Sequence, residues 1–227
     1  MKKRAIALSI ILPIAAIAAI GGSAAAEGRF FLRAGAGAGI PSLNNLESEL
    51  ALQEYGEELA PGLSIAVSLG RSFAEEAWSL ELYIAGAVYR DFLYGNDYEG
   101  FAANLRHYDF MGVLRRHWRA EAKWFRPSLG IGAGYGSTEL ISGGGKMGAM
   151  QGIGALRVES ALRENLFLAV ECAYSFGLQT KAFDAPFIEN VESDAVYTSD
   201  HEPLEDRYDC LEIRIGITVR LPKTLQE

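Results

Sequence analysis

Apolar and polar side chains alternate strictly in this chain, in segments of about ten residues, and no other feature constrains the fold as much. Successive side chains of a β-strand face opposite sides, so each segment would carry one apolar and one polar face. The pattern is clearest in the last segment. Its apolar members are Leu211, Ile213, Ile215, Ile217, Val219 and Leu221, and they alternate with Glu212, Arg214, Gly216, Thr218 and Arg220.

Seven further segments repeat this rhythm, which makes an even total of eight. Each is long enough to cross a bilayer at a tilt, and a closed barrel leaves no unpaired backbone edge in hydrocarbon. The segments lie at about residues 30–39, 63–70, 78–89, 105–119, 125–135, 150–162, 166–176 and 211–221. The sequence therefore predicts an all-β fold, an eight-stranded antiparallel up-and-down transmembrane β-barrel.

Two of the segments, 105–119 and 150–162, alternate less regularly. In the first, the outer face is assigned to Tyr108, Phe110, Gly112 and Leu114. In the second, Leu156 and Val158 are placed outward, because Arg157 and Glu159 would be costly against lipid.

The connections between the segments are sorted by length. Residues 73–77, 116–123 and 161–165 form short links, whereas 40–60, 91–104, 137–149 and 179–207 are longer. Outer-membrane barrels have short periplasmic turns and longer extracellular loops. We therefore expect the short links in the periplasm and the long ones outside the cell.

The N-terminus predicts export. Lys2, Lys3 and Arg4 precede an apolar run over residues 5–20, and Ala24-Ala25-Ala26 follows, which is typical of a cleaved signal peptide. We assign residues 1–26 to this peptide and 27–227 to the barrel, with a retained membrane anchor as the alternative. The remaining 18 basic and 29 acidic residues give a net charge near −11, which argues against a nucleic-acid partner.

Charged residues on the polar faces would point into the lumen, where they must be paired or hydrated. Counted from the strand ends, most of them fall in the half near the short links, and we expect a salt-bridge network there. Its predicted members are Arg33, Glu81, Arg126, Arg157, Glu159, Glu171, Glu212 and Arg214.

The other half of the lumen is predicted to be lined by small residues. These are Gly37, Gly39, Ala66, Ala85, Gly132, Gly134, Ala173 and Ser175. Small side chains would leave space, although an eight-stranded barrel has room only for side chains or one small ligand. Two interpretations stay open: a plugged barrel with a water-filled upper cavity, and a gated pore or ligand vestibule.

The two cysteines are predicted to be free thiols. Cys172 falls on the outer face of its segment and Cys210 on the inner face of the next. A disulfide needs Cβ vectors that converge, and opposite faces prevent this.

The histidines do not form a metal or catalytic pattern. His107 and Asp109 share a strand face, but no serine stands two residues from the histidine. His117 lies among Arg115, Arg116 and Arg119 next to a short link, where we expect it to be hydrated. No metal spacing appears, and no cofactor is expected.

These features resemble the small eight-stranded outer-membrane barrels of the OmpA, OmpX and OmpW type. The barrel-assembly machinery of that family reads a signal in the last strand, and the residues that look like it here are Arg214, Gly216, Val219 and Leu221. Many members end on an aromatic residue, whereas this chain continues from Pro222 to Glu227.

The resemblance implies a non-enzymatic barrel in the bacterial outer membrane, in contact with outer-membrane lipid and the barrel-assembly machinery. Its function would lie in exposed loops that bind host or surface ligands, or in passage of small solutes through a narrow pore. One alternative is a lipid-modifying acyl hydrolase or transferase, since some similar barrels use a Ser-His-acid arrangement. Another is a soluble lipocalin-like barrel, which would turn its apolar side chains inward.

Overall fold

A computed structural model describes residues 28–43, 61–90, 104–118, 125–140, 146–179, 181–182 and 205–221. Eight long strands form within these ranges, together with a short pair. The long strands are β1 (Phe30–Ser42), β2 (Gly62–Phe73), β3 (Trp78–Arg90), β4 (Asn104–His117), β5 (Arg126–Leu140), β6 (Lys146–Arg163), β7 (Leu166–Gly177) and β10 (Asp209–Arg220). The short pair is β8 (Lys181–Ala182) and β9 (Glu205–Asp206). All eight predicted segments are thus strands.

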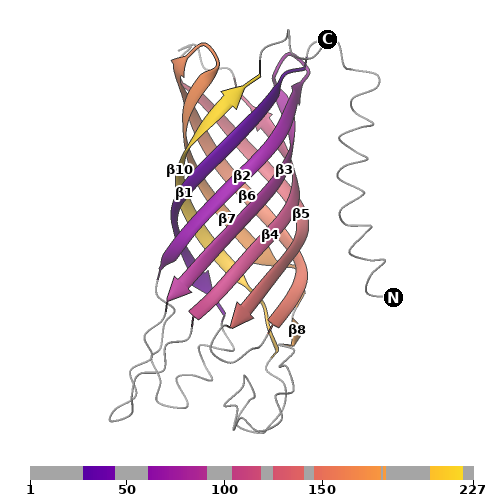
Figure 1. Cartoon of the computed structure of the whole chain (residues 1–227). Helices are drawn as coiled ribbons and strands as arrows, with labels where there is room; N and C mark the ends of the chain where they lie inside the picture. Colours follow the sequence, from indigo (N-terminus) through magenta and orange to yellow (C-terminus); the bar gives the residue numbers. More distant parts are fainter. Residues whose placement is uncertain are drawn as a thin grey trace, which may run out of the picture.

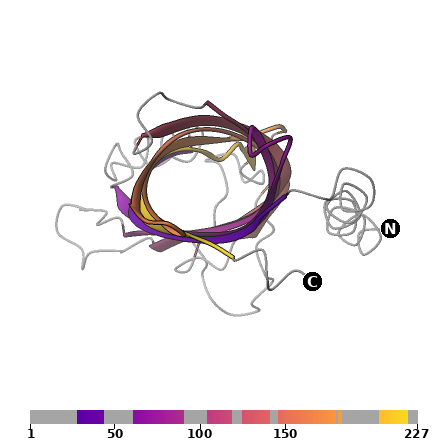
Figure 2. The ribbon, with the colours of Figure 1, turned by 90° about the horizontal axis from the view of Figure 1, so that it is seen from above.

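The long strands close into a single barrel in the order β1-β10-β7-β6-β5-β4-β3-β2, with antiparallel pairing throughout. They run obliquely around the barrel (Figure 1), and the view along its axis shows a complete ring (Figure 2). Closure is made by the first and last long strands, whose register runs from Phe31 opposite Arg220 to Ser42 opposite Asp209. The predicted up-and-down barrel is confirmed.

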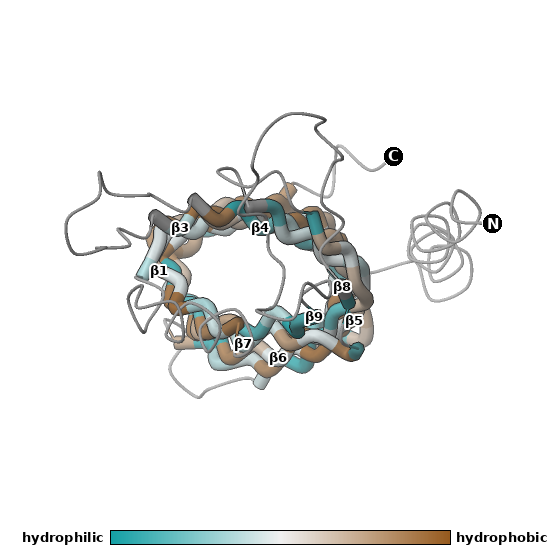
Figure 3. The backbone as a smooth tube through the Cα atoms, turned by 90° about the horizontal axis from the view of Figure 1, so that it is seen from below, coloured by the Kyte–Doolittle hydropathy of each residue, from teal (hydrophilic) through white to brown (hydrophobic). Residues whose placement is uncertain are grey.

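The outer wall of the barrel is apolar, whereas the lumen holds buried charged and polar side chains beside a buried apolar cluster. Figure 3 shows hydrophobic and hydrophilic positions alternating along the strands. Leu63, Ile131 and Ile215 each expose more than half of their surface, while inward residues such as Ser64 and Arg214 are buried. A continuous exposed apolar wall of this kind requires lipid rather than water around it. A soluble lipocalin-like barrel would instead present polar side chains on its outer wall.

The registers assigned to the two irregular segments are also confirmed. In β4, Tyr108 and Leu114 are exposed, while Met111 and Val113 are buried. In β6, Leu156 is exposed and Arg157 is buried beside it. A slip of one residue would have reversed every one of these assignments.

The barrel has two different ends. At one end the short connections include Ala74–Ala77 between β2 and β3 and Glu164–Asn165 between β6 and β7, seen at the top of Figure 1. At the other end, β8 and β9 pair beside the start of β10. We call these the short-turn end and the loop end. Most of the four long links, like the predicted signal peptide, lies outside the described residues.

The described ranges contain no helix that is both long and apolar enough to cross a membrane.

Candidate functional site in the barrel lumen

A network of buried ion pairs crosses the lumen in the half near the short-turn end. Its centre is Glu81 on β3, which has no exposed surface. Glu81 accepts hydrogen bonds from Arg33 Nη1 at 2.9 Å, Arg115 Nε at 2.9 Å and Arg157 Nη1 at 3.2 Å. These three arginines come from β1, β4 and β6, so the contacts join opposite walls of the barrel.

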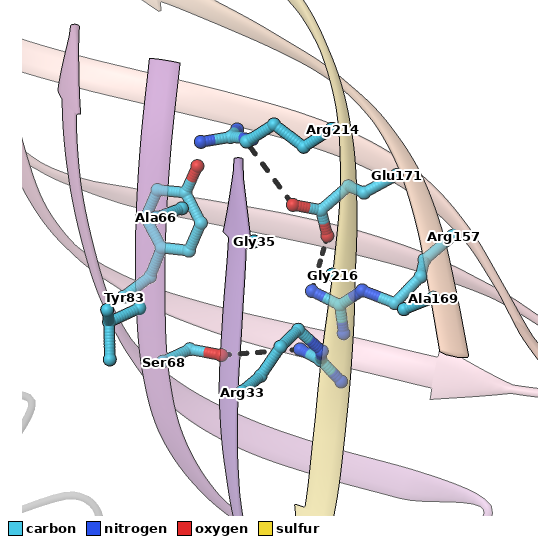
Figure 4. A pocket seen from close by; sticks show the side chains of 11 residues that line it. Arg33, Gly35, Ala66, Ser68, Tyr83, Arg157, Ala169, Glu171, Arg214 and Gly216 are labelled. Atoms are coloured by element: carbon cyan, nitrogen blue, oxygen red, sulfur yellow. Dashed lines mark hydrogen bonds and ion pairs between the residues drawn. The ribbon is translucent and has the colours of Figure 1, made fainter. Parts of the chain in front are cut away.

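Glu171 on β7 extends the network toward the loop end. It accepts from Arg115 Nη2 at 3.0 Å and from Arg157 Nη2, and its other oxygen lies 3.9 Å from Arg214 Nη2. Arg214 in turn donates to Glu212 at 2.9 Å. Figure 4 shows Arg214, Glu171 and Arg157 lying in sequence along one wall.

Glu159 completes the set on the side nearer the short turns. It accepts from Arg33 Nη2 at 2.8 Å and from the Thr218 hydroxyl at 3.0 Å. The network thus contains four arginines and four glutamates, so it is electrically balanced. We call these eight residues the lumen network: Arg33, Arg115, Arg157, Arg214, Glu81, Glu159, Glu171 and Glu212.

Seven of the eight residues that the sequence singled out lie in this network, and one does not. Arg126 contacts Glu76 instead, nearer the mouth of the barrel. Sequence reasoning missed Arg115, which it grouped with the residues around a short turn, although the register of β4 already turns that side chain inward.

The expectation that His117 is hydrated is wrong. His117 is the last residue of β4, it is 7% exposed, and its Nε2 lies 2.9 Å from the Ser79 hydroxyl. β4 extends to His117, two residues into the range 116–123 that was expected to form a short link. Its inward side chains, His117 included, therefore still lie inside the lumen.

A second charge cluster closes the short-turn end. Glu76, in the turn between β2 and β3, accepts from Arg220 Nη1 at 2.8 Å and from both terminal nitrogens of Arg126 at 3.2 Å. Arg29 Nε lies 3.6 Å from its other oxygen. We call Glu76, Arg29, Arg126 and Arg220 the mouth cluster.

The electrostatics of Glu76 follow from this setting. Partial burial alone would raise the pKa of its carboxyl group, but the guanidinium groups of Arg220 and Arg126 outweigh burial and hold the pKa below its usual range. Glu76 is therefore a carboxylate at neutral pH.

The small residues of the loop-end half do not simply leave open space. A Cβ on Gly132 would lie 2.9 Å from Val113 Cγ2 and 3.0 Å from Ile153 Cγ2, and one on Gly39 would lie 2.9 Å from Tyr89 Oη. The small positions accommodate large neighbours such as Val113, Ile153 and Tyr89, which were not among the predicted lumen-lining residues. The resulting buried cluster consists of Ala66, Tyr83, Ala85, Met111, Val113, Ile153, Ala155 and Ala173.

One small cavity lies between the two halves. It has a volume of about 20 Å³ and is bordered by Arg214, Tyr83, Glu171 and Gly216 (Figure 4). Within the described ranges, Arg214 Nε and Nη1 have no hydrogen-bond partner. The cavity has room for about one water molecule, which could satisfy these donors.

Nearer the loop end, His107 joins a hydroxyl and a carboxylate. Its Nε2 lies 2.9 Å from Asp109 Oδ1 and its Nδ1 lies 2.8 Å from Thr138 Oγ1. The threonine lies opposite His107 in the β4–β5 register, so the hydroxyl comes from the neighbouring strand and not from the histidine's own. All three side chains are buried, and the Tyr208 ring stacks on the imidazole at 3.5 Å.

Tyr208 also ties the start of β10 to β3. Its hydroxyl lies 2.8 Å from that of Tyr89, which in turn lies 3.1 Å from Cys210 Sγ. Burial raises the pKa of Tyr208 well above its usual range, so the phenol stays neutral.

The two cysteines are free and lie on opposite sides of the wall. Cys172 is exposed on the outer face, whereas Cys210 is buried in the lumen. Both features agree with the sequence prediction.

The residues that resemble an assembly signal lie on both faces of β10 and just beyond it. Arg214 points into the lumen network, and Gly216 borders the small cavity. Val219 and Leu221 are exposed on the outer wall, where Leu221 N donates to Phe30 O at 2.8 Å. Recognition of this segment by the assembly machinery stays a prediction.

Metal-ligating side chains do not gather in the described part of the chain, where no group of three or more histidine, cysteine, aspartate or glutamate residues could hold an ion.

Comparison with known proteins identifies the fold. No protein-family model and no curated protein matches the sequence. The structure is similar to that of Neisserial surface protein A, with a TM-score of 0.57 and 13% identity over 85% of this chain and 97% of that one.

Two further solved structures overlay less closely. A major outer membrane protein from Thermus thermophilus has a TM-score of 0.46 and 12% identity, over 86% of this chain and 100% of that one. Ail of Yersinia pestis has a TM-score of 0.46 and 9% identity, over 86% of this chain and 99% of that one. The closed eight-stranded topology and the first similarity together show that this chain has the fold of the small eight-stranded outer-membrane β-barrel proteins.

Proposed function

We propose that this protein is a closed, non-conducting barrel of the bacterial outer membrane, whose activity resides in the loops that it holds at the cell surface. The observation that carries the proposal is the lumen network. Glu81 and Glu171 connect arginines from strands on opposite sides of the barrel, and the cavity that borders Arg157 and Glu171 has a volume of about 20 Å³. A narrow lumen filled in this way opposes ion flow.

Conductance of the refolded protein in planar bilayers tests the closed state. The wild type is expected to show no steady conductance. Glu171→Ala removes the carboxylate that lies between Arg115, Arg157 and Arg214, and it is expected to raise conductance, because the arginines lose a partner that holds them across the lumen. Stable ohmic conductance of the wild type would instead support a pore.

The composition of the long links supports a role for them in binding at the cell surface. Residues 44–60, 91–103 and 183–204 together contain 14 acidic residues and no lysine or arginine, whereas residues 141–145 carry no charged side chain. A partner of these loops would therefore carry positive charge or be bridged by cations. This composition favours a host or surface ligand over an anionic solute.

The proposed location places the outer wall in contact with outer-membrane lipid, the short-turn end in the periplasm and the long links outside. Protease treatment of intact cells tests the orientation, since cleavage is expected within 183–204 and not in the turn Ala74–Ala77. Cleavage within 183–204 only after the outer membrane is opened would mean that the long links lie in the periplasm.

A second candidate, a lipid-modifying hydrolase, is supported by the Thr138–His107–Asp109 arrangement. With Asp109 accepting from His107 Nε2–H, Nδ1 is free to accept the threonine proton, as a general base requires. Burial of all three residues argues against access of a substrate. Mass spectrometry of outer-membrane lipid from cells with the wild type or His107→Asn distinguishes the two, because the scaffold leaves the lipid profile unchanged.

A further inference from the structure

The mouth cluster is an arginine-rich site that is occupied by a carboxylate of the chain itself. Arg220 and Arg126 both donate to one oxygen of Glu76, and Arg29 lies near the other. Glu159 Oε2 lies 3.9 Å from Arg220 Nη2, which is beyond hydrogen-bond distance, while its Oε1 accepts from Arg33 and Thr218. Three guanidinium groups therefore converge on a single directly bonded carboxylate, a geometry that suits an oxyanion with more acceptor oxygens.

The turn that delivers Glu76 has an unusual backbone. Ala74, Glu75 and Glu76 have φ angles of 48°, 54° and 64°, and none of them is glycine. Three consecutive residues of this kind in the left-handed region are disfavoured for L-amino acids, and such strain persists only where surrounding contacts enforce it. Within the described residues, the contacts that can enforce it include the arginine contacts of Glu76 and the hydrogen bond from Ala77 N to Ala74 O at 3.0 Å.

A residue with an unsatisfied buried nitrogen lines the same cavity as the mouth cluster. His117 borders the cavity of about 10 Å³ that Glu76, Arg126 and Arg220 also border, and its Nδ1 has no hydrogen-bond partner among the described residues. The Ser79 hydroxyl donates to Glu81 Oε1 at 3.2 Å, so it must accept from His117 Nε2–H. In the neutral imidazole, Nδ1 is then an acceptor that awaits a donor.

We propose that the mouth cluster is a phosphate-binding site, and that Glu76 occupies it until the strained turn relaxes. Hydrogenphosphate offers anionic oxygens to the three arginines and a P–OH donor to His117 Nδ1. With Glu76 in place, the cavity admits no more than about one water molecule. Withdrawal of the turn frees the volume of a carboxylate beside all four nitrogen-bearing side chains.

Two matched glycine variants of the full-length protein test the site. Glu76→Gly and Glu75→Gly each permit a positive φ at one turn residue and each remove one negative charge, but only the first vacates the site. Both are refolded in octyl glucoside, which carries no phosphate, and titrated with inorganic phosphate by calorimetry. Glu76→Gly is expected to bind at least about tenfold more tightly than Glu75→Gly or the wild type, which corresponds to one charge-assisted hydrogen bond.

Two further arms locate the ligand and its source. Adding Arg126→Gln to Glu76→Gly is expected to abolish the gain, and sulfate, which carries no proton at neutral pH, is expected to bind several-fold more weakly than phosphate. If a lipid phosphate monoester is the ligand, dodecyl phosphate added to the micelles, which can offer a P–OH donor, saturates the site and suppresses phosphate binding, whereas a site for free phosphate alone keeps it. Equal phosphate binding by both glycine variants, or none by Glu76→Gly, would overturn the proposal.

Discussion

The two halves of the lumen fill the same narrow cross-section by different means. Near the short turns, the lumen network closes the barrel with four guanidinium groups and four carboxylates. Toward the loop end, Tyr83, Met111, Val113 and Ile153 fill it with apolar volume that small residues on other strands accommodate. One half thus depends on charge balance and the other on shape.

The difference determines how each half responds to substitution. A buried ion pair that loses one partner leaves an uncompensated charge, even if the replacement has the same shape. An apolar cluster tolerates a change of shape as long as its volume is kept. Substitutions that keep the shape of a side chain should therefore lower the free energy of unfolding much more in the charged half than in the apolar half.

The largest effect is expected from Glu81→Gln, which keeps the shape of the side chain but removes the charge shared by Arg33, Arg115 and Arg157. We expect a loss of about 3–5 kcal/mol in the free energy of unfolding, measured by urea titration in lipid vesicles. The control Glu164→Gln lies in an exposed turn and should stay within about 0.5 kcal/mol of the wild type. A loss below about 1 kcal/mol at Glu81 would mean that water already screens the network.

The second-largest loss of stability is expected from a charge placed on the outer wall, which surrounds both halves of the lumen. Ile215 lies mid-strand on the outer face, opposite Ala36 and Val170, so Ile215→Arg should destabilise the barrel in a bilayer by roughly 2–4 kcal/mol. Leu221→Arg, just beyond the end of the same strand, should cost only about 0–1 kcal/mol, since it lies near the interface. Equal penalties at both positions would contradict the depth assigned to β10.

In the apolar half, Met111→Leu should cost less than about 1.5 kcal/mol, because Met111 is fully buried among apolar side chains and leucine keeps nearly the same volume. The same urea titration measures it. If Met111→Leu proved as costly as Glu81→Gln, shape would matter as much as charge, and the contrast between the halves would fail.

The smallest effect concerns Glu76, which is about one-quarter exposed. Its pKa is lower in the folded state than the ordinary 4.5, so its contribution is complete above that value and is lost as pH falls through the folded-state pKa. Unfolding of the wild type and Glu76→Gln should differ by no more than about 1 kcal/mol at neutral pH, and the difference should shrink with acid and with salt. A gap that widens in acid would contradict this sign.

The sequence predicted which side chains face outward and which face the lumen better than it predicted which side chains meet inside the lumen. Alternation fixes which face a residue occupies, and that sufficed to place Arg157 and Glu159 inward and Leu156 outward. It does not fix which inward residues meet. Arg126 shares the lumen with Glu81, but its height along the axis brings it to Glu76 instead.

Two omissions have the same physical origin. Glu76 lies in a turn with positive φ angles, where a period of two has no meaning, so alternation could not place its side chain. Thr138 reaches His107 only through the register between β4 and β5, which a single sequence does not contain. In both cases the missing information is three-dimensional: the turn conformation for Glu76 and the inter-strand register for Thr138.

Several lumen contacts join the first strand to later ones, and this has a consequence for how the protein is made. Arg33 on β1 bonds Thr218, 185 positions later in the chain, and Glu159, 126 positions later. Contacts between such distant positions form late, because the ends of a long segment must first be brought together. Until β10 meets β1, Arg33 remains without its last-strand partner and the interior remains hydrated. The water would leave the lumen only when β10 pairs with β1, and the barrel would become stable at that step. A barrel that has not yet closed would keep a hydrated interior, which would disfavour its release into the membrane.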